Sequence, residues 1–428
     1  MGVSAATERP AAPEWRGVVG WSLYDWANSP FPTLVLTFVI PAYFAQAVTA
    51  EVTTGTAQWG VMQTLASLAI AALSPVLGAI ADRRGGCKPW IAGFTLLMAA
   101  TTALLWTVRP QPDDAMRLLW LVGVALVAFE LAIVFYNAML PHLVPDAWLG
   151  RVSGWAWGLG YLGGLVALIV VLFGFVRIAE PPFGLDRETA EHVRISGPFV
   201  AVWAVVFCLP LFLLTPDSPG QGLPMGEAMR TGLETLRKTL RQLPRHPTLG
   251  RFLLARLLYT DGINTIFVFG GIYAAGTFGL AVEQVIVFGI LLNVTAGLGA
   301  FAFGWLDDAA GPKLTILLSL GGLVIVGIPL LLVESVTWFW ILGVSLGLFV
   351  GPVQAASRSL MARLAPEGME REMFGLYALS GRIAAVLGPP VVSGLTVVFA
   401  SQRIGLATIV PFLLAGGAVL LTIRDPRL

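Results

Sequence analysis

Two acid–amide pairs stand out because each lies inside an apolar segment. Asp25 is followed three residues later by Asn28, and Asp261 is followed in the same way by Asn264. Residues three apart project from one face of a helix. A carboxylate in the bilayer core costs about 2.5–3.5 kcal/mol on insertion scales, so intramembrane acids usually serve a functional site. A tyrosine accompanies each pair, namely Tyr24 and Tyr259.

Three kinds of chemistry are open to these acids. A carboxyl whose surroundings change as a cavity opens to either side could carry a proton together with a substrate. It could equally hold a substrate ammonium. The structural alternative is a hydrogen bond between helices, from Asp to Tyr or Asn, that only holds the bundle together. We expect Asp25 and Asp261 to be cavity acids.

Other polar side chains also fall within apolar segments, in both halves of the chain. They are Glu130, Tyr136, Asn137, Arg256, Gln354, Arg358 and Arg382. A cavity that holds both acids and arginines would suit a zwitterion, with its carboxylate on Arg and its ammonium on Asp. The alternative is an internal ion pair, from Glu130 to Arg256 or Arg382. Arg358 could also be a cytoplasmic anchor.

The composition requires a membrane protein. Hydrophobic residues make up 57% of the chain and charged residues only 12%, against roughly 25% charged residues in globular domains. A span needs ~20 apolar residues, so the chain has room for about twelve spans. We place them at 17–48, 57–81, 90–108, 117–140, 152–177, 197–214, 250–277, 281–306, 313–333, 337–361, 374–400 and 404–423.

The two halves repeat one pattern. A glycine is followed by an aspartate four residues on, then a glycine, then a lysine, at Gly78-Asp82-Gly85-Lys88 and again at Gly304-Asp308-Gly311-Lys313. We therefore predict an all-α fold of twelve transmembrane helices in two pseudo-symmetric six-helix bundles. The predicted parts are a tail at 1–16, a bundle at 17–214, a linker at 215–249, and a bundle with a short tail at 250–428. The linker contains an amphipathic pattern, typical of a helix on the membrane surface or under the bundle, although a plain tether is the alternative.

Charge and composition also restrict location and chemistry. Lysine and arginine concentrate in the tails, the linker and alternate loops, which predicts that both termini are cytoplasmic. We expect an integral protein of the plasma membrane that binds no nucleic acid. Cys87 and Cys208 are too few and too far apart for a disulfide framework or a thiolate metal site. We expect no metal or cofactor, and no enzyme activity, because no buried histidine or cysteine pair accompanies the serines.

Several of these strings resemble a known family. The loop Gly78…Asp82-Arg83-Arg84-Gly85…Lys88 is similar to the signature loop of the major facilitator superfamily. The strings Trp21–Ser29, Phe135–Pro141 and Arg256–Gly262 resemble its Unknown Major Facilitator branch, which includes autophagy-related vacuolar amino-acid effluxers. In that superfamily the first and seventh helices line a central path, so the resemblance would aim both acids inward.

The resemblance and the polar residues together predict a secondary transporter. It would act as a monomer in the lipid bilayer and move a small molecule, an amino acid or similar zwitterion, by alternating access with proton coupling. The alternative is a sensor or a lipid-moving protein that kept the transporter scaffold. Asp82 with Arg83 or Arg84 would latch the cytoplasmic side through bonds to a neighbouring helix end or a loop. Asp308, which lacks adjacent arginines, would form a weaker latch. A solvated, positively charged loop is the alternative to a latch.

Overall fold

The computed structural model describes residues 10–217, 222–243 and 247–423. Parts of the predicted tails and linker therefore lie outside the described residues. Within the described residues every regular element is a helix. Ten helices there are long and apolar enough to cross a membrane, and a bent pair at 247–278 makes an eleventh. A further helix, at 370–399, occupies the position of the eleventh predicted span.

The first span is broken into four helical pieces. They are α1 (Trp15–Asn28), the π-helical η1 (Phe31–Phe38), α2 (Ile40–Tyr43) and the π-helical η2 (Phe44–Val48). Pro30 has no N–H to donate four residues back, which frees the carbonyl of Trp26. The indole Nε1 of Trp203 donates to that oxygen at 3.1 Å. The break in the helix is thus compensated by a side chain from another helix.

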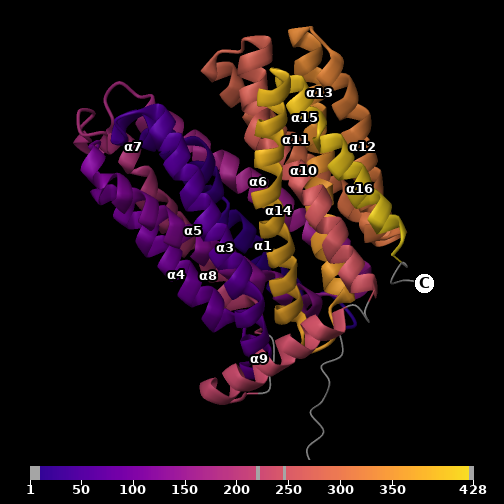
Figure 1. Ribbon diagram of the computed structural model, residues 1–428. Coiled ribbons are helices and arrows are strands. Elements are labelled where there is room, and N and C mark those ends of the chain that lie inside the picture. The colour runs from indigo at the N-terminus through magenta and orange to yellow at the C-terminus, as the bar shows by residue number, and fades with distance from the viewer. Residues whose placement is uncertain (1–9, 218–221, 244–246, 424–428) are drawn as a thin grey trace, which may run out of the picture.

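The rest of the first half consists of five long helices and short connections. The long helices are α3 (Val52–Arg84), α4 (Lys88–Ala103), α5 (Ala115–Leu143), α6 (Leu149–Val171) and α8 (Ser196–Leu214). The short helix α7 (Glu191–Arg194) precedes α8. The helix α9 (Met225–Gln242) follows α8 and lies across one end of the molecule (Figure 1).

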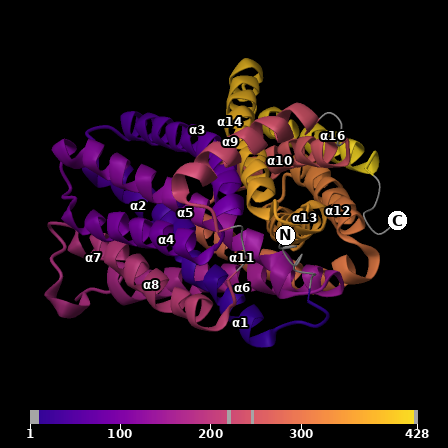
Figure 2. The ribbon, with the colours of Figure 1, turned by 90° about the horizontal axis from the view of Figure 1, so that it is seen from below.

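The second half repeats this arrangement. Its helices are α10 (Pro247–Phe278), α11 (Val282–Ala310), α12 (Pro312–Leu332), α13 (Val336–Leu364), α14 (Glu370–Phe399), α15 (Gln402–Ala407) and α16 (Ile409–Leu421). Figure 1 shows the two halves close together near α9 and diverging away from it. Figure 2, turned by 90° so that the molecule is seen from below, shows the first half beside the second with α9 near their boundary.

The most extensive contacts between the halves come from two pairs of helices. α3 packs against α14, and α6 packs against α11. α9 packs on the end of α3 through the buried residues Ala228, Gly232 and Leu236. Its apolar residues Met229 and Leu233 stay exposed. The predicted amphipathic helix is present, and its contact with a lipid leaflet stays a prediction.

Candidate functional site

A cavity of about 1000 Å³ lies between the two halves. Its wall is formed mainly by α1, η1, α5 and α6 from the first half and by α10, α11, α13 and α14 from the second, with further residues from α3, α12, α15 and α16. Along α13 the wall runs from Phe339 to Arg358, and Arg363, further along this helix, donates to the carbonyl oxygen of Asp146 in the first half at 2.9 Å. The cavity therefore lies beyond a closed layer when approached from α9.

An ion pair between the halves forms part of the cavity wall. Nη1 of Arg358, on α13, lies 3.0 Å from a carboxylate oxygen of Asp25, on α1. The same guanidinium donates to the Oγ and the carbonyl oxygen of Ser153, on α6, at 2.9 and 2.7 Å. Arg358 is only 2% exposed, so the interpretation of this residue as a cytoplasmic anchor is wrong. An arginine buried this deeply needs such partners, because a buried charge without them costs several kcal/mol.

Aromatic rings enclose the same guanidinium. The rings of Trp21, Trp157 and Tyr136 lie 4.9, 5.6 and 5.7 Å from Cζ of Arg358. Trp21 and Tyr136 also stack on each other, with centroids 4.4 Å apart. Such faces attract a cation through their quadrupole. They hold the guanidinium in place, so its position is largely fixed before a solute arrives.

A second ion pair crosses the cavity. Glu130, on α5, pairs with Arg382, on α14. This is one of the two internal pairs that the sequence left open. In both cross-cavity pairs the first half supplies the acid and the second half supplies the arginine. A dipolar solute between the halves would therefore meet carboxylates on one side and guanidinium groups on the other.

Most of the predicted site residues border this cavity. They are Asp25, Asn28, Glu130, Asn137, Arg256, Tyr259, Asn264, Gln354, Arg358 and Arg382. Three others lie behind the wall. Tyr24 and Tyr136 are buried in the first half, where the hydroxyl of Tyr24 bonds to that of Thr95 at 2.7 Å. The expectation that these two tyrosines line the cavity is wrong, because α1 and α5 turn them toward neighbouring helices.

Asp261 also lies off the cavity wall. It is 1% exposed and faces α14, where a methyl group on Gly388 would lie 2.3 Å from a carboxylate oxygen. Its neighbours Thr260 and Asn264 do border the cavity. Positions three apart differ by about 60° around a helix, and that difference is enough to turn the acid into the α10–α14 interface. The two halves thus present their acids differently in this structure.

Two aromatic residues of α6 were not among the predicted site residues. Trp157 and Tyr161 both border the cavity. The hydroxyl of Tyr161 donates to Oε1 of Gln354, on α13, at 2.7 Å. This bond is another link across the interface of the halves. The spacing of Trp157 and Tyr161, four residues apart, was the available signal that they share one helix face.

The α9 side is closed by an acid at the end of α3. The two carboxylate oxygens of Asp82 accept from the backbone N–H groups of Arg371 and Glu372, at 3.1 and 2.9 Å. These groups belong to the first turn of α14, where backbone N–H groups lack partners within the helix. The Arg371 side chain pairs with Asp82 at 3.3 Å and donates to Sγ of Cys87 at 3.1 Å.

The arginine that pairs with Asp82 therefore comes from the opposite half. Arg83 and Arg84 were expected to take part in the latch with Asp82, but the arginine at Asp82 is Arg371. Arg83 donates to Oγ1 of Thr235, on α9, at 2.8 Å, and Arg84 is exposed. The prediction that Asp82 bonds to a neighbouring helix end agrees with the contacts to α14.

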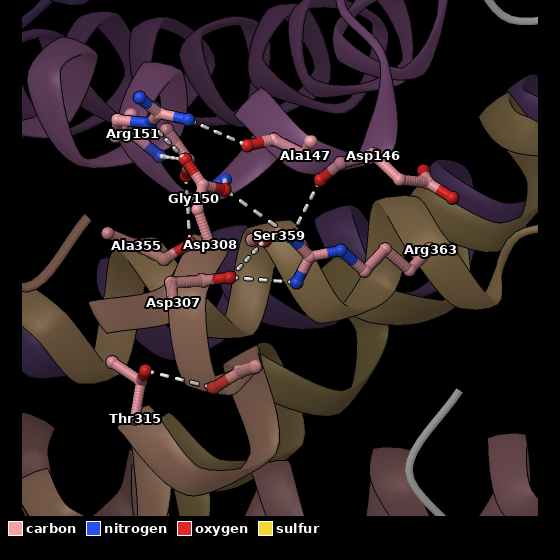
Figure 3. A network of polar contacts seen from close by, with 12 residues as sticks. Asp146, Ala147, Gly150, Arg151, Asp307, Asp308, Thr315, Ala355, Ser359 and Arg363 are labelled. Atoms are coloured by element: carbon pink, nitrogen blue, oxygen red, sulfur yellow. Dashed lines mark hydrogen bonds and ion pairs between the residues drawn. The ribbon is translucent and has the colours of Figure 1, made fainter. Parts of the chain in front are cut away.

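The second copy of the loop makes the corresponding contacts at the start of α6. Asp308 accepts from the backbone N–H groups of Gly150 and Arg151, at 2.8 and 3.1 Å, and from Nε of Arg151 at 2.6 Å (Figure 3). Arg363 lies 3.5 Å from the other oxygen of Asp308 and 2.7 Å from Asp307. The expectation of weaker contacts at Asp308 is wrong, because its arginines arrive from other helices.

Glycines allow these helices to approach closely. A methyl group on Gly78 would lie 2.3 Å from the carbonyl oxygen of Arg371, and one on Gly154 would lie 2.3 Å from that of Ala300. On α14, a methyl on Gly375 would lie 2.5 Å from the carbonyl oxygen of Ser74. Helix pairs in membranes use small residues in this way to bring backbones into contact. We call these contacts, with the bonds of Asp82 and Asp308, the α9-side gate.

Comparison with known proteins agrees with this arrangement. The family described as "Vacuole effluxer Atg22 like" matches residues 56–427. The chain belongs to this family. Among Atg22-like relatives, the uncharacterized MFS-type transporter YxiO of Bacillus subtilis is 26% identical over 378 residues, which cover 86% of both chains. Autophagy-related protein 22 of Cryptococcus neoformans is 24% identical over 265 residues, which cover 56% of this chain and 44% of the fungal protein.

Solved structures show the same fold. The human organic anion transporter MFSD10 superposes with a TM-score of 0.74 at 15% identity, over 95% of this chain and 99% of that one. The major facilitator transporter FucP, in its outward conformation, gives 0.73 at 14% identity, over 96% and 98%. The predicted family and the predicted all-α fold are therefore confirmed. This Atg22-like chain is an integral membrane transporter and not an enzyme.

Proposed function

We propose that this Atg22-like chain moves an amino acid or a similar zwitterion by rocker-switch alternating access, coupled to protons. The observation that carries the proposal is the pair of ion pairs across the cavity, Asp25–Arg358 and Glu130–Arg382. A zwitterion can replace such a pair, because its carboxylate can take the arginine and its ammonium can take the acid. The description of the family as a vacuole effluxer favours efflux as the direction.

The shape of the site supports transport over the alternative of a sensor or a lipid-moving protein. That alternative predicts polar groups that do not converge on one enclosed space. Here the ionisable groups Asp25, Glu130, Arg256, Arg358 and Arg382 all border one cavity between the halves. The α9-side gate separates the cavity from one side of the bundle. We propose that rocking of the halves opens this gate and closes the opposite side.

We propose Asp25 and Asp261 as the groups that exchange protons. Asp25 borders the cavity and changes its surroundings whenever a solute displaces it from Arg358. Asp261 is buried against Gly388, and neither of its oxygens has a hydrogen-bond partner of normal geometry among the described residues. A proton on that carboxyl would remove the cost of burying its charge. We further propose that the protein acts as a monomer in the plasma membrane, with both termini and α9 in the cytoplasm.

Uptake into proteoliposomes tests the proposal. Amino-acid flux is measured with and without a pH gradient for the wild type, Asp25→Asn and Asp261→Asn. We expect at least one variant to lose gradient-driven accumulation while retaining downhill exchange. Asp113→Asn, an exposed acid in the loop before α5, is the matched control. If both cavity-region variants accumulate solute like this control, the coupling proposal fails; if no amino acid is transported, the substrate proposal fails.

A further inference from the structure

We propose that Arg256 is the anchor for a carboxylate of the solute, so that the cavity selects solutes with a net negative charge. This inference rests on the proposed function and narrows it, from zwitterions in general to acidic ones. Among amino acids, the acidic members fit because they carry two carboxylates and one ammonium. The argument starts from the charges on the cavity wall.

The wall of the cavity has one more guanidinium than carboxyl. The acids that line it are Asp25 and Glu130, and the basic residues that line it are Arg256, Arg358 and Arg382. Arg358 pairs with Asp25, and Arg382 pairs with Glu130. Arg256 forms an ion pair with no acid in the described part of the chain. One cation on the wall is therefore left without a counter-charge.

Neutral groups hold Arg256 in position. Its Nη1 donates to the carbonyl oxygen of Tyr377 at 2.6 Å and to Oγ of Ser380 at 2.8 Å. Its Cζ lies 3.4 Å from the centroid of the Tyr377 ring. Nε is buried and has no hydrogen-bond partner in the described structure. The guanidinium is thus oriented by α14 while its charge stays uncompensated, a combination that favours binding of a carboxylate.

Asp261 does not supply the missing counter-charge at this position. Both residues lie on the side of α10 that packs on α14, and each faces a glycine there. A methyl on Gly381 would lie 2.7 Å from Nη1 of Arg256, whereas the carboxylate of Asp261 faces Gly388. The two glycines are seven residues apart, which is about 10 Å along a helix. Arg382, which follows Gly381 in α14, pairs with Glu130 and borders the same cavity as Arg256.

This arrangement suits a solute with an additional carboxylate. When the cavity closes to both sides, an excess charge in it loses contact with water, at a cost of several kcal/mol. A solute of charge −1 cancels that excess. One of its carboxylates would bind Arg256, and its remaining ammonium and carboxylate would meet the neighbouring acid and arginine. A neutral zwitterion would leave the excess charge uncancelled.

Glutamate and glutamine provide the test, because they match in size and differ by one charge. Initial uptake of each by the full-length protein in proteoliposomes is measured for the wild type, Arg256→Gln and Arg256→Lys. We expect the wild type to prefer glutamate by about tenfold or more, which is the ratio that one hydrogen bond to a charged group provides. Arg256→Gln should lose this preference and still transport glutamine, while Arg256→Lys should keep part of it. Arg403→Gln is the matched control, because Arg403 likewise donates to neutral groups, the carbonyl oxygens of Leu332 and Val333, and lies off the cavity wall.

The outcomes separate the two proposals. Equal uptake of glutamate and glutamine by the wild type overturns the charge selection and leaves amino-acid transport standing. An undiminished glutamate preference in Arg256→Gln overturns the assignment of Arg256 as the anchor. Transport of neither amino acid by the wild type removes the proposed function, and the inference falls with it. Retained preference in Arg256→Lys shows that a loss in Arg256→Gln comes from charge and not from misfolding.

Discussion

A single methyl group at Gly78 should open the α9-side gate. In the structure a Cβ at this position would lie 2.3 Å from the carbonyl oxygen of Arg371, 2.7 Å from its carbonyl carbon and 3.0 Å from Cα of Glu372. All three atoms belong to the backbone of α14, so no side-chain rotation relieves the overlap. Gly78→Ala therefore requires α3 and α14 to separate.

The size of the effect follows from the geometry. Ordinary Cβ contacts begin near 3.4 Å, so the two helices must separate by about 1 Å at this point, and overpacking of this kind typically costs about 1–3 kcal/mol. That separation also stretches the bonds that Asp82 accepts from the first turn of α14. If the closed and open states differ by a few kcal/mol, as is usual for two-state carriers, the change is enough to reverse their populations.

The assay measures the distance between spin labels placed at the α9-side ends of α3 and α14. Gly78→Ala should broaden or lengthen the distance distribution and raise the access of water-soluble reagents to the cavity from the α9 side. Gly60→Ala, also in α3, is the control, because a Cβ there would meet nothing within 4 Å. Both substitutions gain the same helix propensity, of about 1 kcal/mol. Identical distances and access in the two variants would refute the steric account of the gate.

Three further variants test other contacts. Asp308→Asn should open the gate more than Asp82→Asn, because Asp308 lies close to more arginine groups; reagent access to the cavity reports the order. Trp203→Phe should lower the unfolding midpoint by leaving one carbonyl of α1 unpaired, at about 1–3 kcal/mol; an unchanged midpoint contradicts the role of that bond. Asp25→Asn should destabilise the protein more than the double variant Asp25→Asn, Arg358→Gln, because the single change leaves a buried guanidinium without its counter-charge; equal melting temperatures would show that the pair is not coupled.

The fold was largely predictable because hydrophobic length and repeated motifs are properties of the sequence. Helices occupy the positions of all the predicted spans in the described ranges. Pro30, Pro32 and Pro41 indicate that the first span is interrupted, but they do not indicate that the interrupted pieces η1 and η2 are π-helical. The sequence gives no measure of how a helix such as α10 rotates about its axis. The orientation of α10 about its axis is set by packing against α14, and in this orientation Asp261 faces α14 and not the cavity.

The ion-pair partners were the least predictable part of the site. Arg83 or Arg84 was expected to form the latch together with Asp82, yet the arginine that pairs with Asp82, Arg371, lies in the other half. The internal repeat could have indicated this partner. Asp82 and Asp308 occupy corresponding positions in the two halves, and each bonds to the start of a helix in the opposite half, α14 and α6 respectively. Glu130 had two candidate arginines in the sequence, and only the three-dimensional arrangement distinguishes Arg382 from Arg256.

The cavity and the gate are coupled through α13. Arg358 binds Asp25 at the cavity, and the next residue, Ser359, donates at 3.1 Å to Asp307, which precedes the gate residue Asp308. A solute carboxylate that binds Arg358 would compete with Asp25 and so weaken a bond between the halves. Without that bond, the halves would be held together on the α9 side mainly by the gate bonds to the first turns of α6 and α14. We expect the bound solute to lower the barrier to rocking for this reason, so solute should raise reagent access from the α9 side in the wild type and have little effect in Arg358→Gln.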